Sequence, residues 1–285
     1  MNTGPTPVGP PTSPQATSAR RFRAWAGVRR VLGRWVPPAL LLAALVAVWE
    51  VWVIVRHTPK YVVPSPGRVA GAFFESAHLL PGHVATTVEE ALIGLVVGAA
   101  AGVALAALLV LVPLARRVLE PLLVTSQTIP MIVLAPILAF WFGIGIAPKI
   151  LVVALITFFP VAVSTASGLT DVDPEMVELV RSMGASPRRT LRVVAVPHAV
   201  PAFFAGLRIA AAYAVAGAVI GELVGGQRGL GVFITREKAS FRMDRLLVAV
   251  FVIAALSSIL FALINVLARL ATPWKRGTGT PMELA

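Results

Sequence analysis

The chain has 285 residues, of which 57% are hydrophobic and only 13% are charged, and its formal net charge is +12. Soluble domains carry about a quarter charged residues. This composition, with a mean hydropathy of +0.84, therefore indicates a membrane protein and excludes an ordinary soluble enzyme. The absence of cysteine excludes disulfides and thiolate metal sites.

The N-terminal residues 1–34 are predicted to lie outside the folded domain. Positions 1–19 are rich in proline, threonine, serine and glycine, a composition that cannot bury a core and indicates a disordered tail. Residues 20–34 carry six arginines and Trp25, which is typical of a basic segment at a membrane interface. A second tail is predicted at 273–285.

The middle of the chain has the pattern of a polytopic membrane protein. A membrane span needs roughly 20 mostly apolar residues. Six stretches meet this requirement: 36–55, 87–112, 119–142, 149–169, 201–224 and 246–270. The third is interrupted by Pro130 and Pro136. We therefore predict an all-α fold with about six transmembrane helices, in a membrane domain over residues 35–272.

The distribution of positive charge predicts the orientation of these spans. Six spans place both termini on one side, and that side carries 15 lysines and arginines against 9 on the other. Cationic loops are retained in the cytoplasm, so we expect both termini to be cytoplasmic in a protein of the cell inner membrane. The same rule accounts for the high net charge, so the expected partner is the lipid bilayer and not nucleic acid.

The second span carries small residues at a four-residue spacing, Gly94, Gly98 and Gly102. Such a pattern lets helix backbones approach closely in lipid. We expect this face to pack against another span of the same chain in preference to a dimer contact.

The cytoplasmic loop 171–200 has the pattern of a helix, a glycine elbow and a second helix. Asp173 is a helix cap and Pro174 suits the first helical position. Apolar side chains then recur at helical spacing until Gly184, which suits a helix C-terminus. Pro187 begins a second short helix, expected to end before Pro197. The apolar face must be buried either against this chain's own spans or in a groove of a partner, and periodicity does not choose between them.

The same loop resembles a known motif. Residues 178–180 (Glu-Leu-Val), Gly184 and 194–197 (Val-Ala-Val-Pro) have the spacing of the EAA loop of bacterial ABC importer permeases. Leu179 and Val180 stand where that family usually has alanine. The resemblance extends over residues 60–272. Within the family, the chain is similar to the nitrate/sulfonate/taurine-type branch, which also includes importers of thiamine-precursor pyrimidines.

The resemblance implies partners and coupling residues. It implies an ATPase subunit that grips the loop, a second copy of this permease and an extracytoplasmic solute-binding protein. The residues implied in ATPase coupling are Asp173, Glu175, Glu178, Leu179, Val180, Met183, Gly184, Ala185, Leu191 and Pro197. None of the four lysines follows a glycine, so the chain has no P-loop. ATP and Mg²⁺ are therefore expected on the partner, with no cofactor and no catalysis on this chain.

Polar residues within the spans are candidates for the solute pathway, because they are costly in lipid. The residues that we single out are Thr125, Ser126, Gln127, Thr128, Ser164 and Glu222. For Glu222, a gate or binding-protein contact and a capping or packing role are equally consistent with the sequence. Arg208 is expected to extend its charge towards the cytoplasmic surface, and Asn265 to form a helix–helix hydrogen bond.

The predicted function is inward movement of a small anionic or heterocyclic solute by alternating access. An ion-coupled secondary transporter is the alternative, but it would show internal repeats and charged, broken helices at the midplane. A membrane-embedded enzyme would need clustered histidines or carboxylates at membrane depth. Neither pattern is present in the sequence.

Overall fold

The computed structural model describes residues 36–274, except for the side chains at positions 120 and 124. These residues form helices joined by short connections, and five helices are long and apolar enough to cross a membrane. With the shorter apolar helix Met131–Phe142, they confirm the predicted all-α, multi-pass membrane fold. The predicted tail 1–34 and the C-terminal tail from residue 275 onwards lie outside the described residues.

The first predicted span forms the helix Val36–Val55 in one compact unit of the chain. Its apolar side chains are largely exposed, as expected of a helix surrounded by lipid. In the same unit Glu50 accepts a hydrogen bond of 3.3 Å from the backbone N–H of Gly67, at the start of α2 (Pro66–Ser76).

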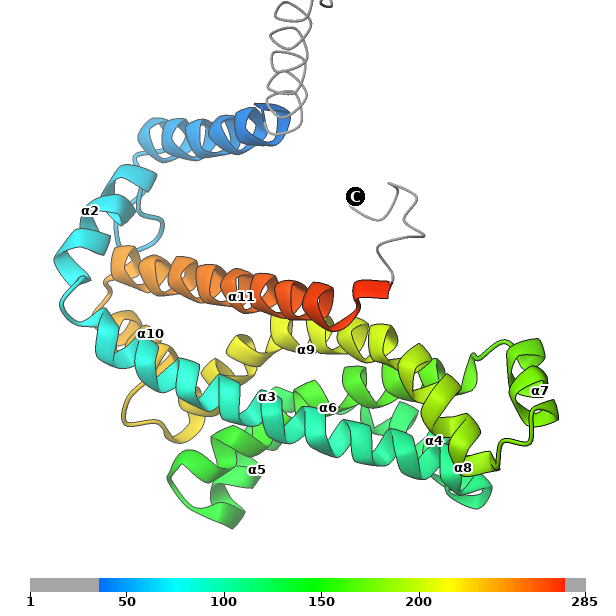
Figure 1. The fold of residues 1–285 in the computed structure, drawn as a ribbon. Coiled ribbons are helices and arrows are strands. Elements are labelled where there is room, and N and C mark those ends of the chain that lie inside the picture. The colour runs from blue at the N-terminus through cyan, green and yellow to red at the C-terminus, as the bar shows by residue number, and fades with distance from the viewer. Residues whose placement is uncertain (1–35, 275–285) are drawn as a thin grey trace, which may run out of the picture. The chain divides into compact units, whose positions relative to one another are not determined.

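The second unit is built on four long helices that pack side by side (Figure 1). They are α3 (Leu80–Leu111), α6 (Ile146–Thr170), α9 (Val196–Gly225) and α11 (Met243–Ala271). Helix α9 contacts the other three. Its core face is made of small side chains, including Ala210, Ala214 and Ala218, which are fully buried. Small side chains allow close helix contact where lipid supplies no hydrophobic driving force.

The small residues of α3 pack against α6, which confirms the predicted contact within the chain. A Cβ added at Gly102 would lie 2.9 Å from the carbonyl oxygen of Phe158 in α6. Gly94 and Gly98 likewise leave no room for a Cβ beside Val153 and Ala154. The four-residue spacing thus brings the backbones of α3 and α6 together.

The third predicted span, 119–142, is two helices and not one. Helix α4 (Pro113–Ser126) ends before Pro130, and α5 (Met131–Phe142) begins after it. Proline lacks the N–H that would continue the helix and disfavours helical geometry in the residue before it. Pro136, by contrast, lies inside α5 without breaking it.

The second helix of the cytoplasmic loop does not end before Pro197 as predicted. Helix α8 (Pro187–Thr190) continues through a π-helical turn, Leu191–Ala195, directly into α9. Across this turn the N–H of Val196 bonds to the carbonyl of Leu191. The wider turn shifts the hydrogen-bond register just before the proline, which cannot donate. Residues 187–225 therefore form one continuous apolar helical path.

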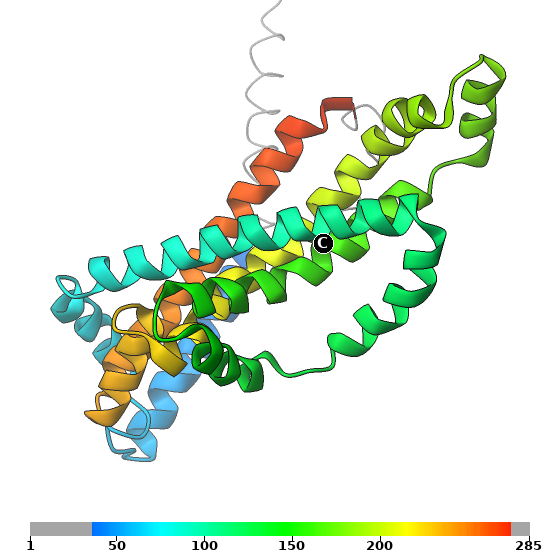
Figure 2. The same ribbon diagram turned by 90° about the horizontal axis from the view of Figure 1, so that it is seen from below.

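Two short helices lie at opposite ends of this bundle (Figures 1 and 2). Helix α7 (Pro174–Ser182) follows the C-terminus of α6, and α10 (Leu230–Ala239) follows the C-terminus of α9. Because α6 has 25 residues, it spans about 37 Å at 1.5 Å per residue. The two ends are thus about a membrane thickness apart.

Candidate functional site

Helix α7 begins with the cap that the sequence predicts. The Asp173 carboxylate accepts a hydrogen bond of 2.9 Å from the N–H of Glu175, and Pro174 occupies the first turn. A carboxylate there satisfies a free N–H and interacts favourably with the helix dipole. The start of α7 is therefore determined by residues 173–175 alone.

A Schellman motif at Gly184, just after α7, terminates the helix. Gly184 has φ +83°, a conformation that other L-residues rarely adopt. Its N–H bonds to the carbonyl of Arg181 at 2.9 Å, and the N–H of Ala185 bonds to the carbonyl of Val180 at 3.2 Å. These two bonds satisfy carbonyls that would otherwise have no partner. The glycine elbow therefore exists, and Val180 and Ala185 contribute to it through their backbones.

The apolar face of α7 is open. No residue of α7 is buried, and Met176, Leu179 and Met183 are 53%, 58% and 79% exposed. Figure 2 shows α7 standing beyond the ends of the long helices. Of the two alternatives that the sequence leaves open, burial against the chain's own spans does not occur within the described residues. The face is available to a partner.

The remaining coupling candidates occupy several positions. Glu175 and Glu178 are exposed on α7. Leu191 is the first residue of the π-helical turn and is partly exposed, whereas Pro197 is exposed in the first turn of α9. The predicted set therefore forms one continuous segment from α7 to the start of α9.

The candidate pathway residues do not form a single patch. The hydroxyls of Thr125, Ser126 and Thr128 donate to backbone carbonyls of residues three or four positions earlier, at 2.9, 2.8 and 2.7 Å. Such bonds satisfy carbonyls around helix breaks. Ser164 packs at the close approach of α6 to Gly206 in α9. Three of the four consecutive polar residues thus serve local backbone bonds.

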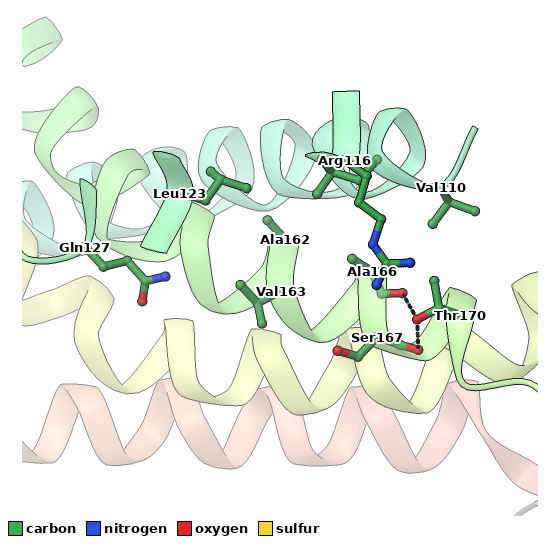
Figure 3. Close-up of a pocket in the computed structure, with 10 residues that line it drawn as sticks. Val110, Arg116, Leu123, Gln127, Ala162, Val163, Ala166, Ser167 and Thr170 are labelled. Carbon is green, nitrogen blue, oxygen red and sulfur yellow. Dashed lines mark hydrogen bonds between the residues drawn. The ribbon is translucent and has the colours of Figure 1, made fainter. Parts of the chain in front are cut away.

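Gln127 is the candidate that lines a cavity. The cavity lies between the end of α3, α4 and α6 and has a volume of about 150 Å³ (Figure 3). Its polar lining residues are Arg116, Gln127, Ser167 and Thr170. The cavity combines a cation, an amide and hydroxyls with apolar walls, which is the composition of a small-molecule site.

A buried ion pair joins α3 to α6. The Nζ atom of Lys149 lies 2.6 Å from Oε1 of Glu90, and both side chains are buried. A buried cation or carboxylate is strongly unfavourable without its partner. The pair was not singled out from the sequence, because its members are 59 positions apart and no local pattern links them.

Glu222 lies at the junction of α3, α9 and α10. It is 1% exposed, and its carboxylate accepts hydrogen bonds from the Thr87 hydroxyl at 2.6 Å and from the N–H of Gly231 at 2.5 Å. Oγ1 of Thr87 accepts in turn from the N–H of Leu230 at 2.9 Å. Two N–H groups in the first turn of α10 are therefore capped by side chains of α9 and α3. Of the two roles weighed for Glu222, the geometry is that of capping and packing.

The glycines after α9 make room for that carboxylate. Gly229 has φ +126°, and a Cβ at this position would overlap the Glu222 carboxylate. His83 contacts the same glycine, with Nδ1 2.8 Å from its carbonyl oxygen and 3.1 Å from its nitrogen. The glycine-rich run 225–231 is therefore a cradle for Glu222 and the start of α10.

This arrangement defines a class of protein: a multi-pass membrane protein that exposes an amphipathic helix at one end of its helix bundle. Residues 94–277 match the model of the family described as "binding-protein-dependent transport system inner membrane component". This match covers more than half of the chain. The chain therefore belongs to this family, and it is the membrane permease subunit of a binding-protein-dependent importer for a small solute.

Individual relatives agree with this assignment. The chain is 36% identical to the formylaminopyrimidine transport permease protein ThiX of Halalkalibacterium halodurans, over 84% of this chain and 96% of the relative. It is 34% identical to the riboflavin transport system permease protein RibX of Chloroflexus aurantiacus, over 92% and 96%. It is 28% identical to the taurine transport system permease protein TauC of Escherichia coli, over 82% and 87%.

A solved structure shares the fold. A chain of an amino acid ABC transporter, crystallised with histidines, superimposes with a TM-score of 0.56 at 17% sequence identity, over 70% of this chain and 97% of that chain. Family membership implies an ATPase subunit and a solute-binding protein as partners.

Proposed function

We propose that an ATPase subunit docks on the segment 173–197 and drives inward movement of a small heterocyclic solute through this permease. The observation that carries the proposal is the exposed apolar face of α7, at the end of the bundle opposite to α10. An amphipathic helix with an open apolar face is suited to a groove on a partner.

The proposed roles of the coupling residues follow from their positions. Met176, Leu179 and Met183 supply the apolar face, while Glu175 and Glu178 supply charge beside it. Gly184 sets the direction in which the chain leaves α7. Because α8, the π-helical turn and α9 are continuous, a displacement of this segment by the ATPase would be transmitted along α9 to the other end of the bundle.

The partner carries the ATP chemistry in this proposal. The chain has no P-loop, so ATP and Mg²⁺ would bind to the separate ATPase chain. We further propose that two copies of the permease form the transporter, since closed two-fold symmetry is the common arrangement of homomeric assemblies. The sequence count of 15 lysines and arginines on one side of the predicted spans against 9 on the other supports a cytoplasmic location for the loop that contains α7 and for both termini.

The solute class is proposed from the relatives. Those named for formylaminopyrimidine and riboflavin transport are 36% and 34% identical to this chain, whereas the taurine permease is 28% identical. We therefore expect a solute that contains a pyrimidine-like ring, in preference to an alkyl sulfonate. Gln127 lies at one end of the cavity, and Ser167 and Thr170 lie toward the other (Figure 3). Together these side chains offer hydrogen bonds suited to such a ring.

A crosslinking experiment tests the docking proposal, helped by the absence of cysteine in the chain. Met183→Cys is expressed with the ATPase carrying one cysteine in its docking groove. The matched control is Ile144→Cys, because Ile144 is 77% exposed and precedes α6 at the opposite end. We expect an ATP-sensitive crosslink for Met183→Cys and none for Ile144→Cys. Equal crosslinking of both, or of neither in an inserted protein, would contradict the proposal.

Uptake measurements test the solute class separately. Cells that express the complete transporter with its binding protein are given labelled formylaminopyrimidine, riboflavin or taurine. Uptake of a ring compound that unlabelled taurine does not inhibit is the expected result. Uptake of taurine alone would overturn the proposed class while leaving the docking proposal intact.

A further inference from the structure

A second cavity lies near the α7 end of the bundle, between α9 and the C-terminal part of α11. Its volume is about 680 Å³. Arg208 on α9 and Arg269 on α11 both line it, together with Asn265 and Trp274, and no carboxylate is among the described residues that line it. Among the described residues its charged lining is therefore cationic, and it is separate from the Gln127 cavity.

Arg208 is held in place but is not neutralised. Its Nε donates to the carbonyl of Phe204 at 3.2 Å, and Nη1 donates to Oδ1 of Asn265 at 3.4 Å; the latter is the helix–helix bond expected of Asn265. A guanidinium has five N–H groups, so further donors remain. Within residues 36–274, no carboxylate forms an ion pair with Arg208. A partly buried cation in lipid gains most from an anion that two or more of its N–H groups can reach.

We propose that this cavity binds the phosphate group of an anionic phospholipid. The surface beside it is suited to acyl chains, because Phe204 of α9 lines the cavity and Phe261, about one helical turn before Asn265 on α11, is 41% exposed. Trp274, just beyond α11, is half-exposed, and tryptophan prefers the headgroup level of a bilayer. Basic cavities between transmembrane helices on the cytoplasmic side are suited to anionic headgroups. A lipid bound there would contact both α9 and α11. Helix α9 continues from the proposed coupling segment.

Lipid binding to the full-length chain tests this proposal directly. The protein is purified in a zwitterionic detergent and titrated with phosphatidylglycerol or phosphatidylcholine, and bound lipid is counted by native mass spectrometry. We expect phosphatidylglycerol to bind at least about fivefold more tightly, and Arg208→Gln to remove about fivefold of its affinity. The matched control is Arg228→Gln, which removes the same charge from an exposed position at the α10 end and should leave the affinity unchanged.

Several results would overturn the proposal. They are equal binding of the two lipids, equal losses in the two arginine variants, and displacement of phosphatidylglycerol by inorganic phosphate at matched concentration. The last result would assign the cavity to a soluble anion. Should Arg208→Gln not elute as folded protein, Asn265→Ala replaces it. That variant removes the oxygen that orients Arg208, so it should weaken phosphatidylglycerol binding and leave phosphatidylcholine binding unchanged; no change in either would also overturn the proposal.

Discussion

Helix α7 is held by bonds within residues 173–185, whereas α10, at the other end of the bundle, is held by side chains from α3 and α9. The face of α7 is open, and the first turn of α10 is buried. A helix that folds locally and buries nothing can dock on a partner without disturbing the bundle. A helix capped by two neighbours is part of the bundle, so changes there should affect the stability of the whole domain.

The largest effect is expected when the buried ion pair near the α10 end is broken. Glu90→Ala leaves the ammonium of Lys149 buried without its partner, which should cost about 3 to 5 kcal/mol in unfolding free energy. The measurement is thermal unfolding of the purified protein. The double variant Glu90→Ala/Lys149→Met should recover much of the loss, and Glu89→Ala, at an exposed neighbouring position, should behave like the unmodified protein. A stable Glu90→Ala protein would show that the pair is not structural.

A second prediction compares two glycines of the same run. Gly229→Ala places a methyl group against the Glu222 carboxylate at φ +126°, which should displace that carboxylate from Thr87 and Gly231. We expect a loss of about 2 to 4 kcal/mol from strain and broken hydrogen bonds. At Gly225 an added Cβ meets no atom within 4 Å, so Gly225→Ala should change stability by less than about 0.5 kcal/mol. Similar unfolding midpoints for the two variants would show that the space Gly229 leaves for the Glu222 carboxylate does not contribute to stability.

A third prediction uses two adjacent threonines of α3. Thr87→Val keeps the shape of the side chain but leaves the N–H of Leu230 without its acceptor and removes one of the two donors to the Glu222 carboxylate. The expected loss is about 1 to 2 kcal/mol. Thr86→Val removes only a bond to the carbonyl of Gly82 and should be nearly neutral. Thermal unfolding of the pair separates the cap of α10 from a general effect of valine in this turn.

The α7 end and the α10 end of the bundle also differ in how many of their structural features can be predicted from the sequence. Asp173, Pro174 and Gly184 act on backbone groups a few residues away, so their roles are readable from local spacing. Glu222 and Thr87 are 135 positions apart, and their contact depends on how α3 and α9 pack, which no local pattern specifies. The spans were predicted from apolar length, but the break at Pro130 and the π-helical turn before Pro197 depend on backbone hydrogen bonds that hydropathy does not describe.

The smallest effect on the stability of the helix bundle is expected at Gly184, where a substitution strains the elbow locally and transport is the more sensitive measurement. A Cβ there meets no atom within 4 Å, so the cost of a substitution comes from φ +83° alone, about 1 to 2 kcal/mol for Gly184→Leu and less for Gly184→Asn. Because α7 buries nothing, this strain should not reach the bundle, and both variants should insert and unfold normally. The strain should instead redirect α7, so Gly184→Leu should abolish solute uptake and the ATP-sensitive Met183→Cys crosslink, while Gly184→Asn retains both. Normal uptake by Gly184→Leu would mean that the elbow does not position the docking helix, and that the open face of α7 serves another purpose.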